Sequence, residues 1–248
     1  PFLFGITITI NIGSIITPFS SSENILIASY FNLDFGWFMG KLIIFALFAL
    51  LITLFLLDLL LLSKQEPPEE MRKKILLEIM NPNLVIVNRK SFFLNVIYFG
   101  IIVISFIFFS QFSYIIAIAG ALLISILNGK NIASSIAKID WKLIFFFISL
   151  FLIIGNMEIN QTFTLITNFL LRLNLNRTLL IALGTLIIIS LLSGFLANSP
   201  TAIIGIQVLS NLYGENVPPV ILIAFLLGIN LGGNLLPQGA ACDVMTLN

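Results

Sequence analysis

Long apolar runs constrain this chain more than any other feature. The run from Leu42 to Leu62 contains only two polar residues, Thr53 and Asp58. A hydrocarbon core about 30 Å thick is crossed by roughly 20 helical residues, so this run has the length of a membrane-spanning helix. Apolar residues make up 59% of the chain and charged residues 9%, whereas soluble domains carry about 25% charged residues. Too few charges are present to coat a water-soluble body, and we predict an all-α polytopic membrane protein.

Further uninterrupted apolar segments predict further spans. They are Phe92–Phe109, Tyr114–Leu127 and Leu143–Ile154, and the second is short for a full crossing. Residues 161–173 differ, because their polar and apolar side chains fall on opposite faces of a helix. This pattern predicts an arm helix lying in the membrane interface.

Three other apolar segments are interrupted by Asn, Gly, Ser and Pro. They are residues 2–30, 178–213 and 217–248. These residue types break helices, so the first and third segments predict discontinuous helices. The second carries Asn198-Ser199-Pro200 in its middle, which predicts the tip of a re-entrant hairpin. A single proline-kinked region with a polar cap is the alternative.

Basic residues locate the cytoplasmic side. Residues 63–90 are the longest polar stretch and contain Lys64, Arg72, Lys73, Lys74, Arg89 and Lys90. By the positive-inside rule this linker is cytoplasmic. It separates residues 1–62, the expected end of a first repeat, from residues 91–248, the expected second repeat. When membrane crossings are counted from this cytoplasmic linker, the two repeats have opposite orientations in the membrane.

One motif occurs in both halves. The residues NIGSIITP, starting at Asn11, reappear as NLGGNLLP, starting at Asn230, an offset of 219 residues. The same offset aligns Ser20 with Gly239 and Asn24 with Asp243. One copy alone fits close helix packing as well as it fits an ion site. Two copies in opposite directions favour the inverted repeat of a secondary transporter.

A helix broken inside the membrane exposes two kinds of backbone group. The second half-helix presents N–H groups that suit an anion, while the end of the first presents carbonyl oxygens that suit Na⁺. The half-helices expected to start near Ser21 and Ala240 would face the anion. Side-chain oxygens that can add specificity come from Asn11, Thr17, Asn230, Asn234 and Gln238.

Two carboxylates, Glu23 and Asp243, lie just past the breaks. Carboxylates within the membrane are usually functional, so either residue can carry a proton or a cation. Each can equally serve only to pair with the positive end of its helix. The sequence leaves both roles open for both residues.

Other functional classes are excluded or disfavoured. The chain has no histidine, which excludes histidine-ligated metal sites and histidine-based triads. Paired carboxylates at membrane depth are also missing, which disfavours a membrane-embedded enzyme, and no cofactor is implied. The net charge of +1 gives no reason to expect a nucleic acid partner.

Four stretches together resemble one group of membrane proteins. They are NIGSIITPFSSSENILIASYFNLDF from Asn11, IDWKLIFFFISLFLIIGNMEI from Ile139, SGFLANSPTAIIGIQV from Ser193 and LGINLGGNLLPQGAACDVMTL from Leu227. In order and spacing they resemble the ion transporter superfamily. That superfamily includes arsenite permeases, citrate-type carboxylate permeases, NhaD-type sodium/proton antiporters and divalent anion:sodium symporters. The resemblance covers nearly the whole chain and indicates no particular substrate.

The resemblance implies an inverted-repeat fold with two discontinuous helices, a re-entrant hairpin at 178–213 and an arm at 161–173. It also implies a homodimer with an elevator-like motion. By position, it implies a cation site made by Ser193, Asn198 and the backbone of Gly239 and Ala240, to which we add Asp243. The expected substrate contacts combine residues at the two breaks with residues at the hairpin tip. They are Asn11, Thr17, Ser20, Asn24, Asn198, Ser199, Thr201, Asn230, Asn234 and Gln238.

The chain departs from the family pattern in two places. Many antiporter and arsenite-type members carry Asp where Ala197 stands, which weakens an antiporter interpretation. Ser21-Ser22-Glu23 stands where Pro-Pro is usual. The hairpin residue Asn198 precedes Asn230 by 32 residues, and the same distance before Asn11 falls ahead of residue 1. We therefore expect a piece of a longer protein that lacks the first hairpin, the opening spans and the last span.

The favoured function is a secondary active transporter of a small anion, either a carboxylate or an oxyanion, coupled to Na⁺ or H⁺. A neutral pocket rich in hydroxyl and amide groups, between two half-helix N-termini, favours an anion. The alternative is a Na⁺/H⁺ antiporter in which Glu23 or Asp243 titrates. In either case we expect a multi-pass protein in the plasma membrane of a prokaryote, with the lipid bilayer and the transported ions as its partners.

Overall fold

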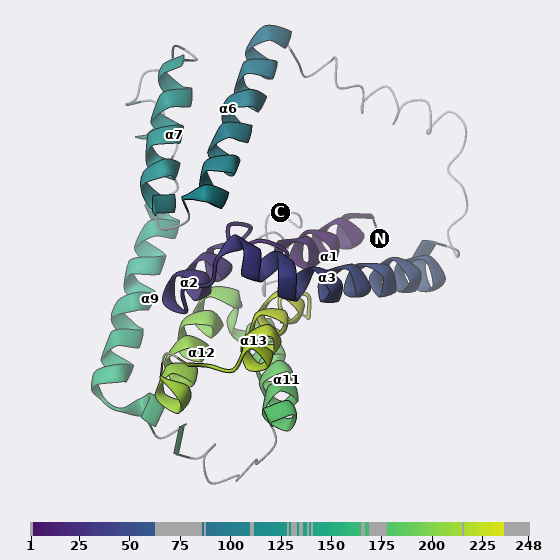
Figure 1. Cartoon of the computed structure of the whole chain (residues 1–248), viewed down its shortest axis with the longest axis vertical. Coiled ribbons are helices and arrows are strands. Elements are labelled where there is room, and N and C mark those ends of the chain that lie inside the picture. Colours follow the sequence, from purple (N-terminus) through teal and green to yellow (C-terminus); the bar gives the residue numbers. More distant parts are fainter. Residues whose placement is uncertain are drawn as a thin grey trace. The chain divides into compact units, whose positions relative to one another are not determined.

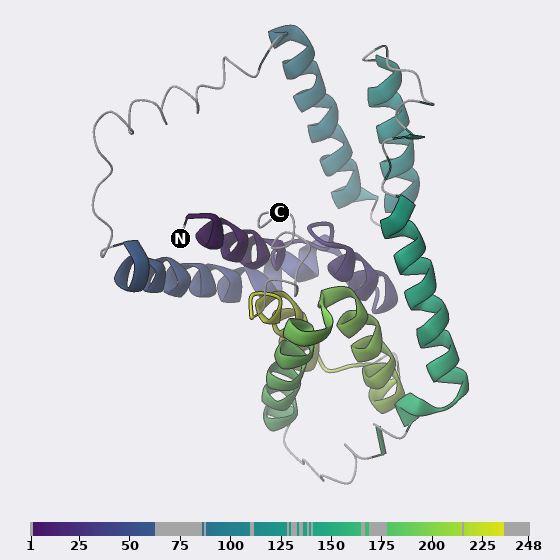
Figure 2. The ribbon, with the colours of Figure 1, turned by 180° about the vertical axis from the view of Figure 1, so that it is seen from behind.

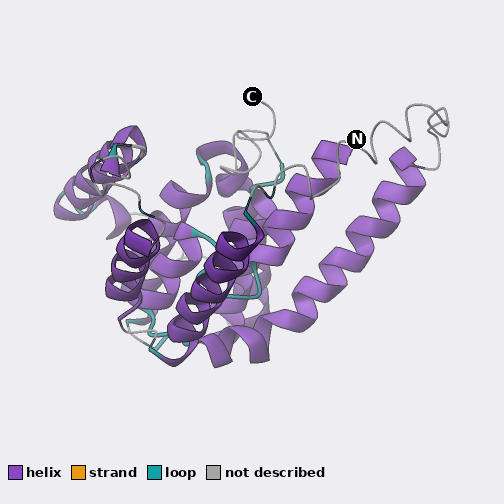
Figure 3. Cartoon of the chain, turned by 90° about the horizontal axis from the view of Figure 1, so that it is seen from above, coloured by secondary structure: helices purple, strands orange, loops and turns teal. Residues whose placement is uncertain are grey.

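The computed structural model describes residues 2–62, 86, 88–109, 112–127, 129, 133, 136, 137, 139, 141–164, 167, 168, 178–214 and 216–235. Every regular element in these ranges is a helix, and no strand occurs among them (Figure 3). Most of the predicted linker and of the predicted arm helix lies outside the described residues. So do residues 236–248 of the predicted second broken helix.

The chain divides into two compact units. The unit Leu62–Trp141 contains α6, Arg89–Phe108, and α7, Ser113–Leu127. These two helices pack closely, because a Cβ added at Gly120 would lie 2.5 Å from the side chain of Ile102. The other unit joins Pro1–Leu61 to Lys142–Asn248. Its helices are α1 (Phe2–Ser14), α2 (Ser22–Tyr30), α3 (Phe35–Leu57), α9 (Trp141–Ile159), α11 (Thr178–Leu196), α12 (Asn198–Tyr213) and α13 (Pro219–Gly232).

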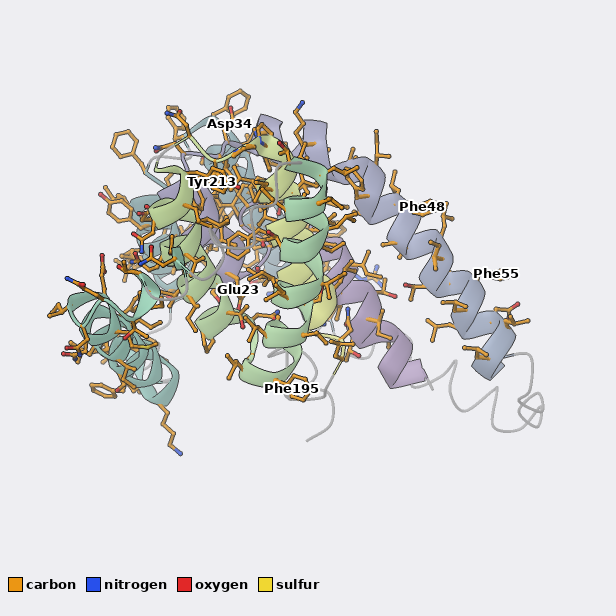
Figure 4. All side chains as sticks on the ribbon, turned by 90° about the horizontal axis from the view of Figure 1, so that it is seen from below. Glu23, Asp34, Phe48, Phe55, Phe195 and Tyr213 are labelled. Carbon is orange, nitrogen blue, oxygen red and sulfur yellow. The ribbon has the colours of Figure 1, made fainter. Side chains whose placement is uncertain are left out.

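In the part of the chain that the structure describes, three helices are long and apolar enough to cross a membrane. They lie within Phe35–Leu60, Arg89–Phe108 and Thr178–Leu196, and shorter apolar helices cover Tyr114–Leu127 and Pro219–Gly232. On α3 the exposed side chains include Phe48 and Phe55, which are 65% and 66% exposed (Figure 4). Exposed aromatic rings along a helix of this length suit lipid as the surrounding solvent. These observations support the prediction of a helical membrane protein.

The helix α3 begins earlier than its apolar run predicts. It starts at Phe35, seven residues before Leu42, because Asp34 caps it by accepting a hydrogen bond from the Trp37 amide at 2.7 Å. Gly36, Gly40 and Lys41 interrupt the apolar pattern of the first two turns, so hydropathy alone missed them. At its other end the helix passes into a π-helical turn, Asp58–Leu62.

Glycines of α13 allow a close contact between α11 and α13. A Cβ added at Gly232 would lie 2.3 Å from the Ser190 carbonyl oxygen, and one at Gly228 would lie 3.0 Å from Ile189. Gly228 and Gly232 are four residues apart and share one helix face, the small-residue spacing that lets membrane helices approach closely. Figures 1 and 2 show α11, α12 and α13 side by side, next to α1 and α2.

Each of the three interrupted segments predicted from the sequence contains a helix end among its described residues. Residues 15–21 separate α1 from α2, and Ala197 alone separates α11 from α12. Because α11 and α12 also contact each other, residues 178–213 form a helical hairpin rather than one kinked helix. The helix α13 ends at Gly232 and passes into turns at residues 233–235. How these helices cross the membrane, and whether the hairpin is re-entrant, stay predictions.

Candidate functional site

The first break is closed by side chains from its own two half-helices. α1 ends at Ser14, which leaves carbonyl oxygens without helical partners. The Asn24 side-chain amide, fully buried, donates hydrogen bonds to the carbonyl oxygens of Ser14 at 2.7 Å and Thr17 at 3.2 Å. The Ser20 hydroxyl also lies within hydrogen-bond distance of both carbonyl oxygens, at 2.6 Å in the case of Thr17, and can donate its proton to either. Asn24 and Ser20 therefore satisfy the backbone groups that the break releases.

A second group of hydrogen bonds joins this break to α13. The Asn230 amide donates to Asn24 Oδ1 at 3.1 Å, and the Ser14 hydroxyl donates to Asn230 Oδ1 at 2.6 Å. The Asn11 amide donates to Asn234 Oδ1 at 2.7 Å. Four asparagines predicted from the sequence are thus brought together, over sequence separations above 200 residues. We call Asn11, Ser14, Asn24, Asn230 and Asn234 the asparagine network.

Ser14 is a member of this network that the sequence analysis did not single out. It aligns with Gly233 in the second motif, so the repeat offered no matching polar residue. Its hydroxyl also lies 2.6 Å from the Asn11 carbonyl oxygen, one turn back on α1. The signal in the sequence that could have identified Ser14 was a small hydroxyl side chain inside the first motif, next to the expected break.

The hairpin tip carries the predicted residues Ser193, Asn198, Ser199 and Thr201, and all four are buried. The Ser193 hydroxyl lies 2.5 Å from Asn198 Oδ1 and 2.9 Å from the Ile229 carbonyl oxygen, so it ties the tip to α13. The Thr201 hydroxyl donates to the Ala197 carbonyl oxygen at 2.9 Å. The hairpin tip therefore lies against the last turn of α13, close to the asparagine network.

One contact joins the hairpin tip directly to the first broken helix. The Ser199 hydroxyl, in the first turn of α12, donates to Glu23 Oε1 at 2.7 Å. Glu23 lies in the first turn of α2. The N-cap residue of this helix is Ser21, whose hydroxyl oxygen accepts a hydrogen bond from the backbone N–H of Asn24 at 3.2 Å. The N-terminal turns of α2 and α12 are thereby brought together. Figure 4 shows Glu23 within the packed helices, whereas Phe48 and Phe55 extend from α3.

The helices around these contacts are almost without charge. α1, α11, α12 and α13 contain no Asp, Glu, Lys or Arg, and α2 contains only Glu23. Apart from the Glu23 carboxylate, polarity at the breaks therefore comes from amides, hydroxyls and backbone groups. Two N-terminal helix turns in such surroundings suit an anion.

Comparison with known protein families decides the family. A family model described as "Citrate transporter" matches residues 1–159 and 113–246, two overlapping segments that span nearly the whole chain. The chain belongs to the citrate transporter family. This membership confirms the resemblance to the ion transporter superfamily. No solved structure matches the chain.

Membership of the citrate transporter family identifies the chain as an integral membrane transporter rather than a member of an enzyme family. In this citrate transporter family member, the predicted site residues Asn11, Ser20, Asn24, Asn230 and Asn234 form or adjoin the asparagine network. Thr17 contributes its carbonyl oxygen to the first break. The predicted residues Gln238, Gly239, Ala240 and Asp243 lie outside the described residues.

The hairpin of this citrate transporter family member turns at a strained residue. Ala197 has φ 75° and ψ 161°, a backbone conformation that is essentially limited to glycine and costs other residues about 1–3 kcal/mol. Ala197→Gly removes that strain, and the added unfolded-state entropy offsets about 0.5–1 kcal/mol of the gain. We expect Ala197→Gly to stabilise the protein by about 1 kcal/mol, measured as a higher melting temperature in detergent.

The matched control is Ala202→Gly, in the middle of α12 at a fully buried position. Glycine inside a helix lowers stability by about 1 kcal/mol, so this variant should melt at a lower temperature. A lower melting temperature for Ala197→Gly as well would contradict the assigned strain.

Proposed function

We propose that this chain belongs to a secondary active transporter that moves a small anion, a carboxylate or an oxyanion, coupled to Na⁺ or H⁺. The observation that carries the proposal is the meeting of the N-terminal turns of α2 and α12 beside the asparagine network. Helix N-termini present unpaired N–H groups and partial positive charge, which favour an anion. The name of the matched family makes citrate the first substrate to test.

The inverted repeat is part of this proposal. Asn11 and Asn230 occupy equivalent positions in the two motifs. Asn11 donates a hydrogen bond to Asn234, in the second motif, and Asn230 donates one to Asn24, which follows the first motif. By the 219-residue offset Asn234 aligns with Ile15 and Asn24 with Asp243. The two bonds are therefore not symmetry equivalents, and the proposed inverted repeat rests on the repeated motif itself. On this basis we propose domains at 1–62 and 91–248, joined by the linker 63–90.

We propose a division of roles among the site residues. Asn11, Asn24, Asn230 and Asn234 bond mainly to one another and to freed carbonyls, so they hold the two breaks in place. Ser199, with the backbone N–H groups of the first turn of α12, then contacts the anion. Substrate roles for Thr17, Ser20, Thr201 and Gln238 are proposed on their positions beside these elements.

The coupling cation site is proposed at the other side of the hairpin tip. Ser193 and Asn198 are both buried. The Ser193 hydroxyl lies 2.5 Å from Asn198 Oδ1 and 2.9 Å from the Ile229 carbonyl oxygen. Hydroxyl, amide and carbonyl oxygens are the ligands that Na⁺ takes at helix breaks. Gly239, Ala240 and Asp243 are proposed to complete this site.

The test uses the full-length protein in proteoliposomes. Labelled citrate, succinate and arsenite are offered under an imposed Na⁺ gradient, an imposed pH gradient, or neither. We expect at least one of the anions to accumulate when one of the gradients is present. If none accumulates under either gradient, the proposal is wrong.

Asn198→Ala should lower gradient-driven uptake at least about tenfold, the change that 1.4 kcal/mol of lost binding energy produces. The control is Asn156→Ala, because Asn156 is an exposed asparagine on α9 that bonds only to its own helix, at the Leu152 carbonyl oxygen. Uptake by the control should match that of the wild type. Equal uptake by Asn198→Ala and the control would show that Asn198 is not part of the transport site.

The alternative, a Na⁺/H⁺ antiporter, is tested in the same vesicles. An antiporter exchanges Na⁺ for H⁺ without any added anion, whereas the proposed transporter requires the anion. Ala197, where many antiporters carry Asp, favours the anion transporter. On the resemblance alone, we also propose that the protein is a homodimer and that it lies in the plasma membrane of a prokaryote. Chemical crosslinking in membranes would detect the dimer.

A further inference from the structure

Glu23 is a buried carboxylate that already has a hydrogen-bond donor. It is 9% exposed, and its Oε1 accepts a hydrogen bond from the Ser199 hydroxyl at 2.7 Å. Ser199 is 9% exposed as well. The two residues are 176 positions apart in the chain and lie in the first turns of α2 and α12. A carboxylate of the protein itself therefore lies where two helix N-termini meet.

The contact occupies the hydroxyl proton of Ser199. A serine hydroxyl has one proton, so it donates to one acceptor at a time. In the structure that acceptor is Glu23 Oε1. The proposed function assigns the same hydroxyl to the transported anion. The anion and Glu23 must therefore compete for Ser199.

Glu23 also has the chemistry of the ligand proposed for this place. Helix N-termini stabilise carboxylates, whether these belong to the protein or to a bound molecule. The other helices that end at the breaks, α1, α11, α12 and α13, contain no Asp or Glu. Among these helices and α2, Glu23 is thus the side chain that can imitate an anionic substrate.

A second hydrogen bond joins α2 to α12 at their other ends. The Tyr30 hydroxyl donates to the Ser210 hydroxyl oxygen at 2.8 Å, and Tyr30 is 47% exposed. This bond involves no carboxylate and lies in the last turns of both helices. It holds α2 against α12 without Glu23, so the buried contact between Glu23 and Ser199 is not the only link between the two helices.

We propose that Glu23 is an internal competitor that occupies the substrate position while no anion is bound. In the empty site its carboxylate accepts the hydrogen bond of Ser199. An acceptor oxygen of the incoming anion takes over that bond, and the Glu23 side chain turns away from Ser199. Glu23 thereby lowers the affinity of the site for its substrate. This inference rests on the proposed function and assigns a residue that sets the affinity of the same site.

The experiment measures equilibrium binding to the purified full-length protein at one fixed pH and one fixed Na⁺ concentration. The probe is whichever of labelled citrate, succinate and arsenite the wild type accumulates. An apparent dissociation constant equals the intrinsic constant divided by the fraction of sites that are ready to bind. With Glu23 on Ser199 in about nine sites of ten, we expect Glu23→Ala to lower the dissociation constant about tenfold. An unchanged or higher constant in folded Glu23→Ala would overturn the proposal.

The gain in affinity must depend on Ser199, because competition requires the shared hydroxyl. When Glu23→Ala is added to Ser199→Ala, the dissociation constant should change by about twofold or less, the range within which independent changes add. A tenfold gain that persists without the Ser199 hydroxyl contradicts the proposal. The matched control is Tyr30→Phe, which removes the other hydrogen bond between α2 and α12. It should bind the probe like the wild type, and an equal gain there would assign the effect to looser helix packing instead.

A second variant decides the question if Glu23→Ala does not fold. Glu23→Asp keeps a carboxylate in the first turn of α2, where it suits the helix N-terminus. Its side chain is one methylene shorter, which withdraws the carboxylate from Ser199. We expect a lower dissociation constant for this variant too, and the wild-type value would refute the competition. If the wild type binds none of the three anions, the proposed function fails rather than the role of Glu23.

Discussion

Replacing Asn230 by leucine should lower transport by roughly 30- to 100-fold, which corresponds to about 2–3 kcal/mol. Asn230 is 2% exposed and belongs to the asparagine network. Its amide donates to Asn24 and to the Leu226 carbonyl oxygen, at 3.1 and 2.8 Å, and its Oδ1 accepts from Ser14. Leucine keeps most of the side-chain volume but leaves both partners from the first break without these bonds, and each unpaired buried group costs about 1–3 kcal/mol.

The effect on transport should exceed the effect on folding. The lost bonds also lower the stability of the fold, but they lie at one place on α13, so we expect Asn230→Leu still to fold. The two breaks would no longer be held together, and the anion site that depends on both would lose its geometry. Citrate uptake and elution from a gel-filtration column, measured on the same preparation, separate the two effects.

Asn156→Leu is the control for this experiment, since Asn156 is exposed and bonds only within α9. It should transport like the wild type. A further check is Asn24→Leu combined with Asn230→Leu. Because the two residues share a bond, the double variant should lose less than the sum of the two single losses. Strict additivity would show that the pair does not act as a unit.

The second large effect is expected at Gly232. A Cβ there would lie 2.3 Å from the Ser190 carbonyl oxygen and 2.6 Å from Ser190 Cα, so the backbones of α11 and α13 would have to move apart. Overpacking of this kind costs about 1–3 kcal/mol, and we expect Gly232→Ala to lie at the upper end because the obstacle is backbone. The melting temperature in detergent should fall, and Asn230 and Ser193, next to the displaced contact, should lose their cross-helix bonds.

The repeat supplies a control for Gly232. Its counterpart in the first motif is Gly13, where an added Cβ would meet nothing within 4 Å. Gly13→Ala should therefore leave the melting temperature unchanged or slightly raised, because alanine favours a helix over glycine by about 1 kcal/mol. Equal losses at Gly13 and Gly232 would mean that the motif glycines act through the backbone conformation and not through the contact between α11 and α13.

The comparison of Gly13 with Gly232 also marks a limit of sequence analysis. The motif aligns them as equivalents, yet only Gly232 lies against another helix. A repeat in sequence predicts similar local conformation, since the same residue types break a helix in both copies. It does not predict the neighbours of each copy, because these come from helices that are themselves different.

Much of the fold was predictable from the order of apolar and polar residues. Breaks were expected within 2–30, 178–213 and 217–248, and helices end within all three at residues 14, 196 and 232. The start of α3 was missed, because a capping aspartate outweighs hydropathy in setting a helix end. The strained turn at Ala197 was also missed, because nothing in an alanine indicates a positive φ.

The sequence by itself determined the class of the protein, the places where its helices break and its family. Those properties depend on local composition and on motifs, which act through the bilayer and the backbone. Only the tertiary structure decided which polar side chains meet. Ser14 reaches Asn230 and Ser199 reaches Glu23 across 216 and 176 residues. Which residues pair is decided by how helices that are distant in sequence pack against each other. The long apolar runs that place the chain in a membrane do not predict that packing.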